Sequence, residues 1–220
     1  MSRTWCSNST IGRLRRDGRE PMRLPADAVL IVIDMQEAID DPRFCARNNL
    51  GAEANIAALI AAWRAETLPL VHIRHDSLEP GSPYAPDAPG HRFKPCATPL
   101  DGETVIGKNA SSAFVSTGLE GLLDELGATT LVICGVLTPN SVEATARHAG
   151  NLGYQVFVVG DACWAVDKTD LRGQRWLADD VHALSLAHLE GEYASVVDAA
   201  TTLRAAAAAK ARQRRAAGKT

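Results

Sequence analysis

The sequence predicts an α/β domain organised on a parallel β-sheet. Short apolar runs alternate along the chain with amphipathic helical patterns, which is typical of a parallel sheet covered by helices on both faces. At 220 residues, of which 46% are hydrophobic, the chain has enough apolar material for one sizeable core. Polar residues follow three of the apolar runs, at Asp34, Lys108 and Ser141. We therefore expect one domain with a polar site at one edge of its sheet.

The two ends of the chain differ in composition from its centre. Residues 1–24 are rich in Arg, Ser and Gly without hydrophobic periodicity, and we expect a flexible basic leader there, with Met22 as an alternative natural start. The folded domain is predicted over residues 25–203. Residues 204–220 are predicted to form an Ala/Arg-rich C-terminal helix and tail.

The first half of the predicted domain contains two strands, one helix and a long connection. Residues 28–33 form a continuous apolar run that ends at Asp34, the pattern of a strand buried on both faces. A helix is predicted over 51–63, with apolar positions at Ile56, Leu59, Ile60 and Trp63. A second strand is predicted over 68–74. The proline-rich stretch 75–102 is long for a connection, and we expect it to act as a lid or an oligomer contact.

The second half repeats this alternation. Strands are predicted over 103–107, 130–134, 154–159 and 193–197, and helices over 119–126, 178–189 and 198–215. Residues 135–141 form a strand-to-helix turn, in which Thr138 is expected as the N-cap and Pro139 as the first helical residue. Ser141 then lies at the electropositive end of a helix, beyond the carboxyl end of a central strand. A hydroxyl there is well placed for chemistry.

Composition argues against several classes of protein. The net charge of −3 disfavours nucleic acid as the main partner, because a phosphate backbone calls for a clustered basic surface. No apolar run approaches the ~18 residues of a transmembrane helix. The five cysteines show no metal-finger spacing, which is typical of a reducing compartment. We expect a cytoplasmic protein without membrane contact, whose partner is a small-molecule substrate.

The polar residues at the strand ends predict the chemistry. A carboxylate such as Asp34 can take the proton of a hydroxyl such as that of Ser141, and the ammonium of Lys108 can orient the carboxylate. Backbone N–H groups of Leu137 and Ser141 can stabilise an oxyanion. Each residue alone has an ordinary structural explanation, as a helix cap, a solvated lysine or a first-turn hydroxyl. Their joint placement favours nucleophilic catalysis.

Three segments of the chain resemble the motifs of one family. They are Val32-Ile33-Asp34-Met35-Gln36, Lys108-Asn109-Ala110-Ser111-Ser112-Ala113-Phe114 and the run 135–145, which begins Gly135-Val136-Leu137-Thr138-Pro139-Asn140-Ser141. In this order they are similar to the motifs of the isochorismatase-like hydrolase superfamily, also called the cysteine hydrolases. The resemblance covers about residues 26–203, and it is specific because all three segments occur in sequence.

The resemblance implies a Rossmann-like three-layer sandwich with a six-stranded parallel sheet in the order 3-2-1-4-5-6. It also implies homo-oligomers, dimers or tetramers, and a non-proline cis peptide before Leu137. In this family an Asp-Lys-Cys triad hydrolyses C–N bonds of small amides through a thioester. Asp34 and Lys108 match that triad, whereas Ser141 stands at the cysteine position. An Asp-Lys-Ser variant is therefore implied.

The serine changes the expected chemistry. The pKa of a thiol, ~8.5 in water, falls towards neutral pH at a helix terminus, whereas the pKa of an alcohol is several units higher. Ser141 would need Asp34 as its base, and a carboxylate whose pKa is held low by Lys108 is a weak base. Two alternatives stay open: vinyl-ether hydrolysis by Asp34 without a nucleophile, as in true isochorismatases, and a catalytically degenerate ligand-binding homologue. An engineered replacement of cysteine is a third.

Four further residues are predicted to bind the substrate: Gln36, His75, Phe114 and Asn140. A structural histidine and a core aromatic are the competing interpretations of His75 and Phe114. No cofactor and no metal are expected, because His72 and His75 would face opposite sides of a strand.

Overall fold

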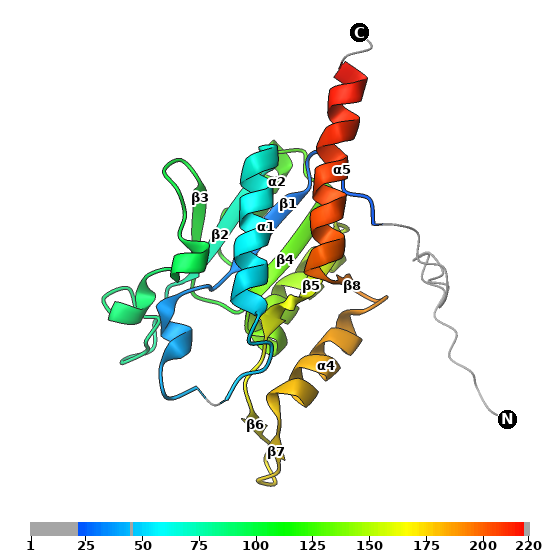
Figure 1. The fold of residues 1–220 in the computed structure, drawn as a ribbon. Helices are drawn as coiled ribbons and strands as arrows, with labels where there is room; N and C mark the ends of the chain where they lie inside the picture. Colours follow the sequence, from blue (N-terminus) through cyan, green and yellow to red (C-terminus); the bar gives the residue numbers. More distant parts are fainter. Residues whose placement is uncertain (1–21, 45, 218–220) are drawn as a thin grey trace, which may run out of the picture.

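Six parallel strands form the centre of the structure, a computed structural model that describes residues 22–44 and 46–217 (Figure 1). Their order is β3-β2-β1-β4-β5-β8. The strands are β1 (Val29–Ile33), β2 (Leu70–His75), β3 (Thr104–Lys108), β4 (Thr130–Val136), β5 (Gln155–Trp164) and β8 (Ser195–Val197). The predicted order 3-2-1-4-5-6 is confirmed, because β8 is the sixth strand of this sheet along the chain.

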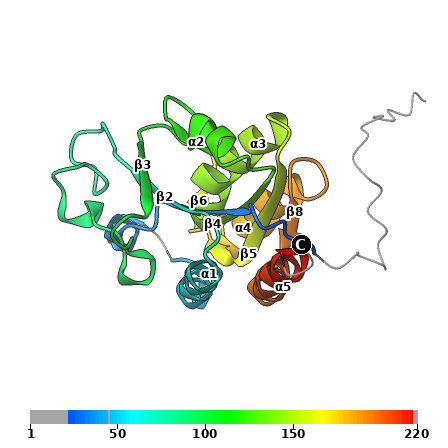
Figure 2. The ribbon, with the colours of Figure 1, turned by 90° about the horizontal axis from the view of Figure 1, so that it is seen from above.

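Helices cover both faces of the sheet. Figure 2 shows α1 (Ala52–Glu66) and α5 (Ala199–Ala217) on one face, and α2 (Leu119–Glu125) and α3 (Glu143–Asn151) on the other. A fifth helix, α4 (Ala178–Leu189), packs against α3 and against the π-helical turn η4 (Thr138–Val142). Short 3-10 turns are η1 (Glu37–Asp40), η2 (Pro89–His91) and η3 (Pro95–Ala97). The predicted three-layer sandwich is therefore confirmed.

The core lies on the two central strands. Every residue of β1 and β4 is buried, because layers of helices cover both faces of these strands. On α1 the predicted apolar positions are all buried, and the indole of Trp63 donates a hydrogen bond of 3.1 Å to the carbonyl of Ala28. This bond satisfies the polar atom of a fully buried ring.

Three features of the chain differ from the sequence prediction. Leu24 is buried in the core and Met22 packs against it, so the folded part begins before the predicted boundary at residue 25, whereas residues 1–21 of the predicted leader lie outside the described residues. Helix α5, which corresponds to the helix predicted over 198–215, lies beside α1 and so continues the folded part past the predicted domain boundary at 203. An antiparallel hairpin of β6 (Lys168–Thr169) and β7 (Arg175–Trp176) interrupts the path from β5 to α4.

The long connection 75–102 is tied to the sheet by hydrogen bonds at several places. The N–H of Asp76 bonds to the carbonyl of Lys108 at 2.7 Å, and that of Lys94 bonds to the carbonyl of Met35 at 2.9 Å. Near its end, the carboxylate of Glu103 accepts bonds from Arg64 and lies 2.9 Å from Nε2 of His72. The connection is thus built into the fold along its length.

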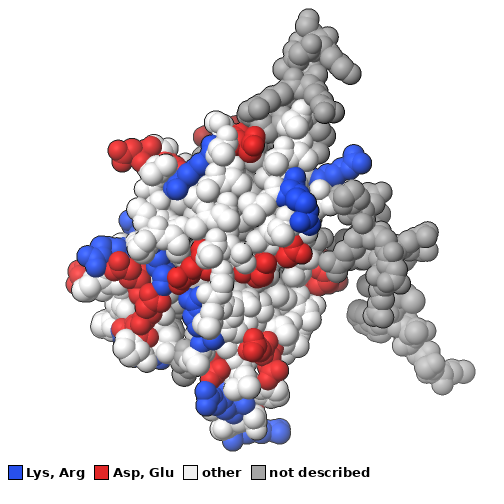
Figure 3. All heavy atoms as spheres, viewed as in Figure 1, with Lys and Arg blue, Asp and Glu red and all other residues white. Residues whose placement is uncertain are grey.

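The surface carries both signs of charge. On the face seen in Figure 3, basic side chains are interspersed with acidic ones and form no continuous band. Within 22–44 and 46–217, no helix combines the length and the apolar character that crossing a membrane requires.

Gly135 has a backbone that a side chain would disrupt. Its φ is +120°, and a Cβ atom there would lie 2.1 Å from the carbonyl oxygen of Ile33 on the paired strand β1. We expect Gly135→Ala to lower the free energy of unfolding by about 3 kcal/mol, through backbone strain and overpacking. Urea denaturation measures this change.

Gly121→Ala is the matched control. Gly121 lies inside α2, where an added Cβ atom meets nothing within 4 Å, so alanine is expected to stabilise the protein by about 0.5–1 kcal/mol. Equal stability of the Gly135→Ala variant and the wild type would contradict the close approach of β4 to β1.

Candidate active site

The structure brings Asp34, Lys108 and Ser141 together at the carboxyl edge of the sheet. The ammonium nitrogen of Lys108 lies 2.8 Å from Oδ2 of Asp34 and 3.2 Å from Oγ of Ser141. It also donates to the carbonyl of Ala110 at 3.1 Å and lies 3.3 Å from Nδ1 of His75. All three predicted side chains are buried, so they form a low-dielectric polar cluster.

Strand register explains how residues so distant in the chain meet. Lys108 ends the edge strand β3 and pairs in register with His75, which ends β2. The next strand is β1, and Asp34 follows it directly. Asp34 adopts a left-handed φ of +51°, a conformation that aspartate tolerates better than most residues, and its N–H bonds to the carbonyl of Ile73. The long side chain of Lys108 reaches across β2 to the carboxylate.

Ser141 is carried by η4, a π-helical turn that continues into α3. The peptide bond between Val136 and Leu137 is cis, as the resemblance implied. The predicted cap is wrong: Leu137 is the N-cap, and Thr138 already belongs to the turn. The hydroxyl of Thr138 instead lies 2.8 Å from Nδ1 of His182 on α4. Packing against α4 therefore holds the turn where a local cap was expected.

The surroundings of Asp34 shift the pKa of its carboxyl group. Burial raises the pKa of Asp34 above its ordinary value, and this effect outweighs the lowering by Lys108 and Ser141. The expectation that Lys108 holds this pKa low is thus wrong, because it left out the cost of desolvating the carboxylate. Among the described residues, Oδ1 of Asp34 is buried without a hydrogen-bond partner. Such an atom beside a cavity is available to a ligand.

A cavity of about 580 Å³ opens onto these groups. Asp34, His75, Leu137, Asn140 and Ser141 line it, as does the segment 77–84 of the long connection. Polar and charged side chains make up more than half of its lining, and apolar and aromatic side chains make up the rest, so the cavity suits a small molecule with several hydrogen-bonding groups. The ammonium of Lys108 lies behind this lining, with its side chain wholly buried.

Two predicted substrate-binding residues lie elsewhere. Gln36 is fully buried, and its amide bonds to the backbone N–H and carbonyl of His75 and to the carbonyl of His91. Phe114 lies in the core, with its ring against those of His148 and Tyr154. Neither lines the cavity. Gln36 positions the end of β2, and Phe114 is the core aromatic of the competing interpretation.

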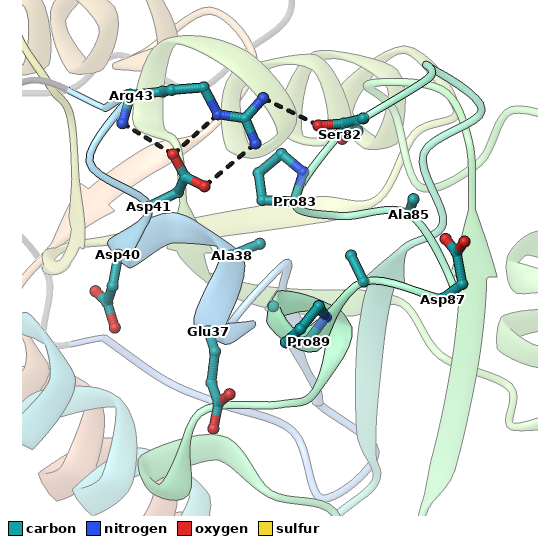
Figure 4. Close-up of a pocket in the computed structure, with 13 residues that line it drawn as sticks. Glu37, Ala38, Asp40, Asp41, Arg43, Ser82, Pro83, Ala85, Asp87 and Pro89 are labelled. Atoms are coloured by element: carbon teal, nitrogen blue, oxygen red, sulfur yellow. Dashed lines mark hydrogen bonds and ion pairs between the residues drawn. The ribbon is translucent and has the colours of Figure 1, made fainter.

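A second cavity of about 600 Å³ adjoins the first (Figure 4). The two share Arg43, Ser82 and Pro83 in their linings, and the guanidinium of Arg43 bonds to Asp41 and to the carbonyl of Gly81. Neither Asp34 nor Ser141 lines the second cavity. The cluster of Asp34, Lys108 and Ser141 therefore lies at the first cavity.

Metal-binding side chains do not converge in the part of the chain that the structure describes. No group of three or more His, Cys, Asp or Glu side chains there is arranged to hold a metal ion. His72 is buried beside Glu103, whereas His75 lines the cavity, so the two histidines have separate environments.

Several residues of the site were not singled out by the sequence. Tyr84 and Arg43 line the cavity, and His182 contacts the turn that carries Ser141. Proline-rich composition of 75–102 signalled a functional segment but not which of its side chains would face the triad. His182 had no signal, because its contact with Thr138 depends on how α4 packs.

Comparison with known proteins agrees with this geometry. The model of the isochorismatase domain matches residues 28–201. The chain belongs to the isochorismatase family. A crystal structure of an isochorismatase-family protein from Chromobacterium violaceum is 53% identical in sequence to this chain. The match covers 86% of this chain and 99% of the crystallised chain, with a TM-score of 0.84. The isochorismatase-family protein YrdC of Bacillus subtilis is 36% identical over 76% of this chain and 90% of its own length.

The names of two further relatives state an activity. A streptothricin hydrolase of Streptomyces noursei is 35% identical over 60% of this chain and 48% of its own length. The ureidoacrylate amidohydrolase RutB of Methylobacterium radiotolerans is 29% identical over 82% of this chain and 80% of its own. Together with the family match, these relatives identify the chain as a hydrolase.

Replacement of Gln36 tests its structural role. Gln36→Leu leaves the N–H and carbonyl of His75 without their side-chain partner, and we expect the free energy of unfolding to fall by about 1–3 kcal/mol. Asn140→Ser, at an exposed position of the cavity lining, is expected to change it by less than about 0.5 kcal/mol. Thermal or urea unfolding measures both. Wild-type stability of the Gln36→Leu variant would contradict the positioning role.

Proposed function

We propose that the protein hydrolyses a C–N bond of the amide type in a small molecule, with Asp34, Lys108 and Ser141 as an Asp-Lys-Ser triad. The observation that carries the proposal is the position of the Lys108 ammonium, within 3.2 Å of both the carboxylate of Asp34 and the hydroxyl of Ser141. The streptothricin hydrolase and RutB relatives favour this class of bond.

In the proposed first step, Asp34 accepts the proton of Ser141 while Oγ attacks the carbonyl carbon. Because the ammonium of Lys108 can only donate, Oγ accepts its hydrogen bond and keeps its own proton available for transfer. A carboxylate whose pKa is raised by burial is a stronger base than a carboxylate whose pKa is low, which supports Asp34 as the general base. The oxyanion that forms is stabilised by backbone N–H groups of Leu137 and Ser141.

Collapse of this intermediate breaks the C–N bond. The proton held by Asp34 passes to the leaving nitrogen, and an ester on Ser141 remains. A water molecule then attacks the ester carbonyl, gives its proton to Asp34, and releases the carboxylic acid as that proton returns to Ser141. Lys108 holds the carboxylate and the hydroxyl in place relative to each other during both steps, since it bonds to both.

A second function is supported by the environment of the same carboxyl group. A raised pKa and an unpaired Oδ1 suit an acid that protonates a vinyl ether, with no nucleophile required. A ligand-binding homologue without turnover is the candidate from outside the enzymes. The two enzymatic candidates differ in the protonation state of Asp34 that they need, and the third has no turnover.

The dependence of kcat/KM on pH separates these candidates. Amide hydrolysis needs the carboxylate, so activity is lost as the pH falls through the pKa of Asp34, which lies above 3.8. Vinyl-ether protonation needs the acid form, so its activity is lost as the pH rises through the same pKa. A panel of small amides, carbamates and isochorismate supplies the substrates for these profiles.

Two variants complete this test. Asp34→Asn is expected to lower either activity by about 10²–10⁴-fold. Ser141→Ala is expected to abolish amide hydrolysis and to leave vinyl-ether hydrolysis in place. Turnover that survives Asp34→Asn would refute both enzyme mechanisms, and no turnover by the wild type on any compound would favour ligand binding.

The position of Ser141 is tested by Ser141→Cys. A thiol there would lie beside the ammonium of Lys108 and at the start of the helix formed by η4 and α3, and both lower its pKa. We expect carboxymethylation by iodoacetamide at pH 7 to be faster than in the wild type. The buried native thiols are poor competitors, because burial raises the pKa of Cys163 to about 12 and that of Cys134 well above its ordinary value. An unreactive new thiol would contradict the placement of Ser141.

A further inference from the structure

His75 is held rigidly at the cavity beside the triad. Its backbone is clamped by the amide of Gln36, which accepts from the N–H at 2.7 Å and donates to the carbonyl at 3.1 Å. The ring packs edge-on against that of Tyr84, with centroids 5.5 Å apart, and lines the cavity. Because hydrogen bonds hold its backbone and an aromatic contact holds its ring, His75 has a defined orientation toward a ligand.

The neighbouring ammonium decides which ring nitrogen carries the proton. Nζ of Lys108 lies 3.3 Å from Nδ1 of His75 and has hydrogens only to donate. A protonated Nδ1 would set two donors against each other, so Nδ1 is the acceptor and the proton sits on Nε2. Lys108 has three hydrogens for four acceptors, so this bond is shared with those to Asp34, Ala110 and Ser141.

The ring is neutral at pH 7. Burial is the largest effect on the pKa of His75 and lowers it, and the positive charge of Lys108 lowers it further. The negative charges that face the ring, those of Asp34, Asp76 and Glu79, raise the pKa by less. Imidazole rather than imidazolium is therefore the form that meets a ligand.

The remaining N–H has no hydrogen-bond partner in the described part of the chain. Among residues 22–44 and 46–217, no group accepts a hydrogen bond from Nε2 of His75, although the ring lines the cavity next to Asp34 and Ser141. A fixed donor at the wall of such a cavity strongly favours a ligand with an acceptor opposite it, because a ligand without one leaves the donor unpaired.

We infer that His75 is a further catalytic residue, which donates a hydrogen bond from neutral Nε2–H to the substrate and whose tautomer Lys108 sets. This inference rests on the proposed function of the same site. The acceptor is an oxygen or nitrogen adjacent to the reacting carbon, and no proton is transferred: the bond stabilises charge that develops on that atom. Lys108 thus serves the triad and the substrate donor together.

Nuclear magnetic resonance of the full ¹⁵N-labelled chain tests the tautomer directly. Long-range ¹H–¹⁵N correlations distinguish Nε2–H, Nδ1–H and imidazolium forms, and the signals of His75 are those lost in His75→Gln. At pH 7 we expect the neutral Nε2–H form in the wild type and a mixture of tautomers in Lys108→Met. The Nδ1–H form or imidazolium in the wild type overturns the inference.

Turnover by paired variants tests the donor. The side-chain amide of glutamine can reach the position of Nε2, whereas the shorter asparagine cannot. We expect His75→Asn to lower kcat/KM by about 10²-fold, as loss of one transition-state donor does, and His75→Gln to retain most of the activity. The control is His188→Gln at the exposed end of α4, which is expected to match the wild type. Equal losses in the two His75 variants, or no loss in either, overturn the inference.

The two tests separate this inference from the proposed function. Turnover that Asp34→Asn abolishes and His75→Asn leaves intact refutes the role of His75 alone. An absence of turnover by the wild type refutes the proposed function and with it a catalytic His75.

Discussion

The site depends on one buried ammonium. The side chain of Lys108 is wholly shielded from solvent, and an unpaired charge in that position would cost several kcal/mol. Its position is stabilised because four acceptors lie within hydrogen-bond distance of its three hydrogens, and the carboxylate of Asp34 is the nearest of them. Removal of that carboxylate would leave the charge without its counter-ion. The cation therefore links the carboxyl group, the hydroxyl of Ser141 and the ring of His75, which other contacts of the fold bring within its reach.

The fold supplies this arrangement through three adjacent strands. Lys108 reaches over β2 to the end of β1, and the register of these strands leaves His75 between the two ends. On the other side of β1, strand β4 approaches so closely at Gly135 that a side chain is excluded. The turn that follows carries Ser141 back toward β1. Mutual parallel pairing of β3, β2, β1 and β4 is thus the scaffold of the cluster.

The sequence predicted the alternation of strands and helices, the end of β1 at Asp34 and the convergence of the triad, because each depends on local apolar patterning and on the geometry of parallel sheets. The errors of the sequence prediction have a common origin: each concerns a side chain whose contacts come from residues distant in the chain. Thr138 carries the residue type of a helix cap, yet its hydroxyl lies beside His182 from a helix more than forty positions away. Gln36 belongs to a recognisable motif, but its amide serves the backbone of β2. Phe114 is a core aromatic.

The amino-acid sequence by itself determined the elements, the parallel arrangement of the strands and the chemical types that meet at the sheet edge, since hydrophobic periodicity and strand-end residues are local properties; the order of the strands was implied by the family resemblance. Only the tertiary structure decided the direction of the Asp34 pKa and the partners of Lys108. Both depend on how completely side chains from distant segments exclude water from one small volume, and no local pattern encodes that desolvation.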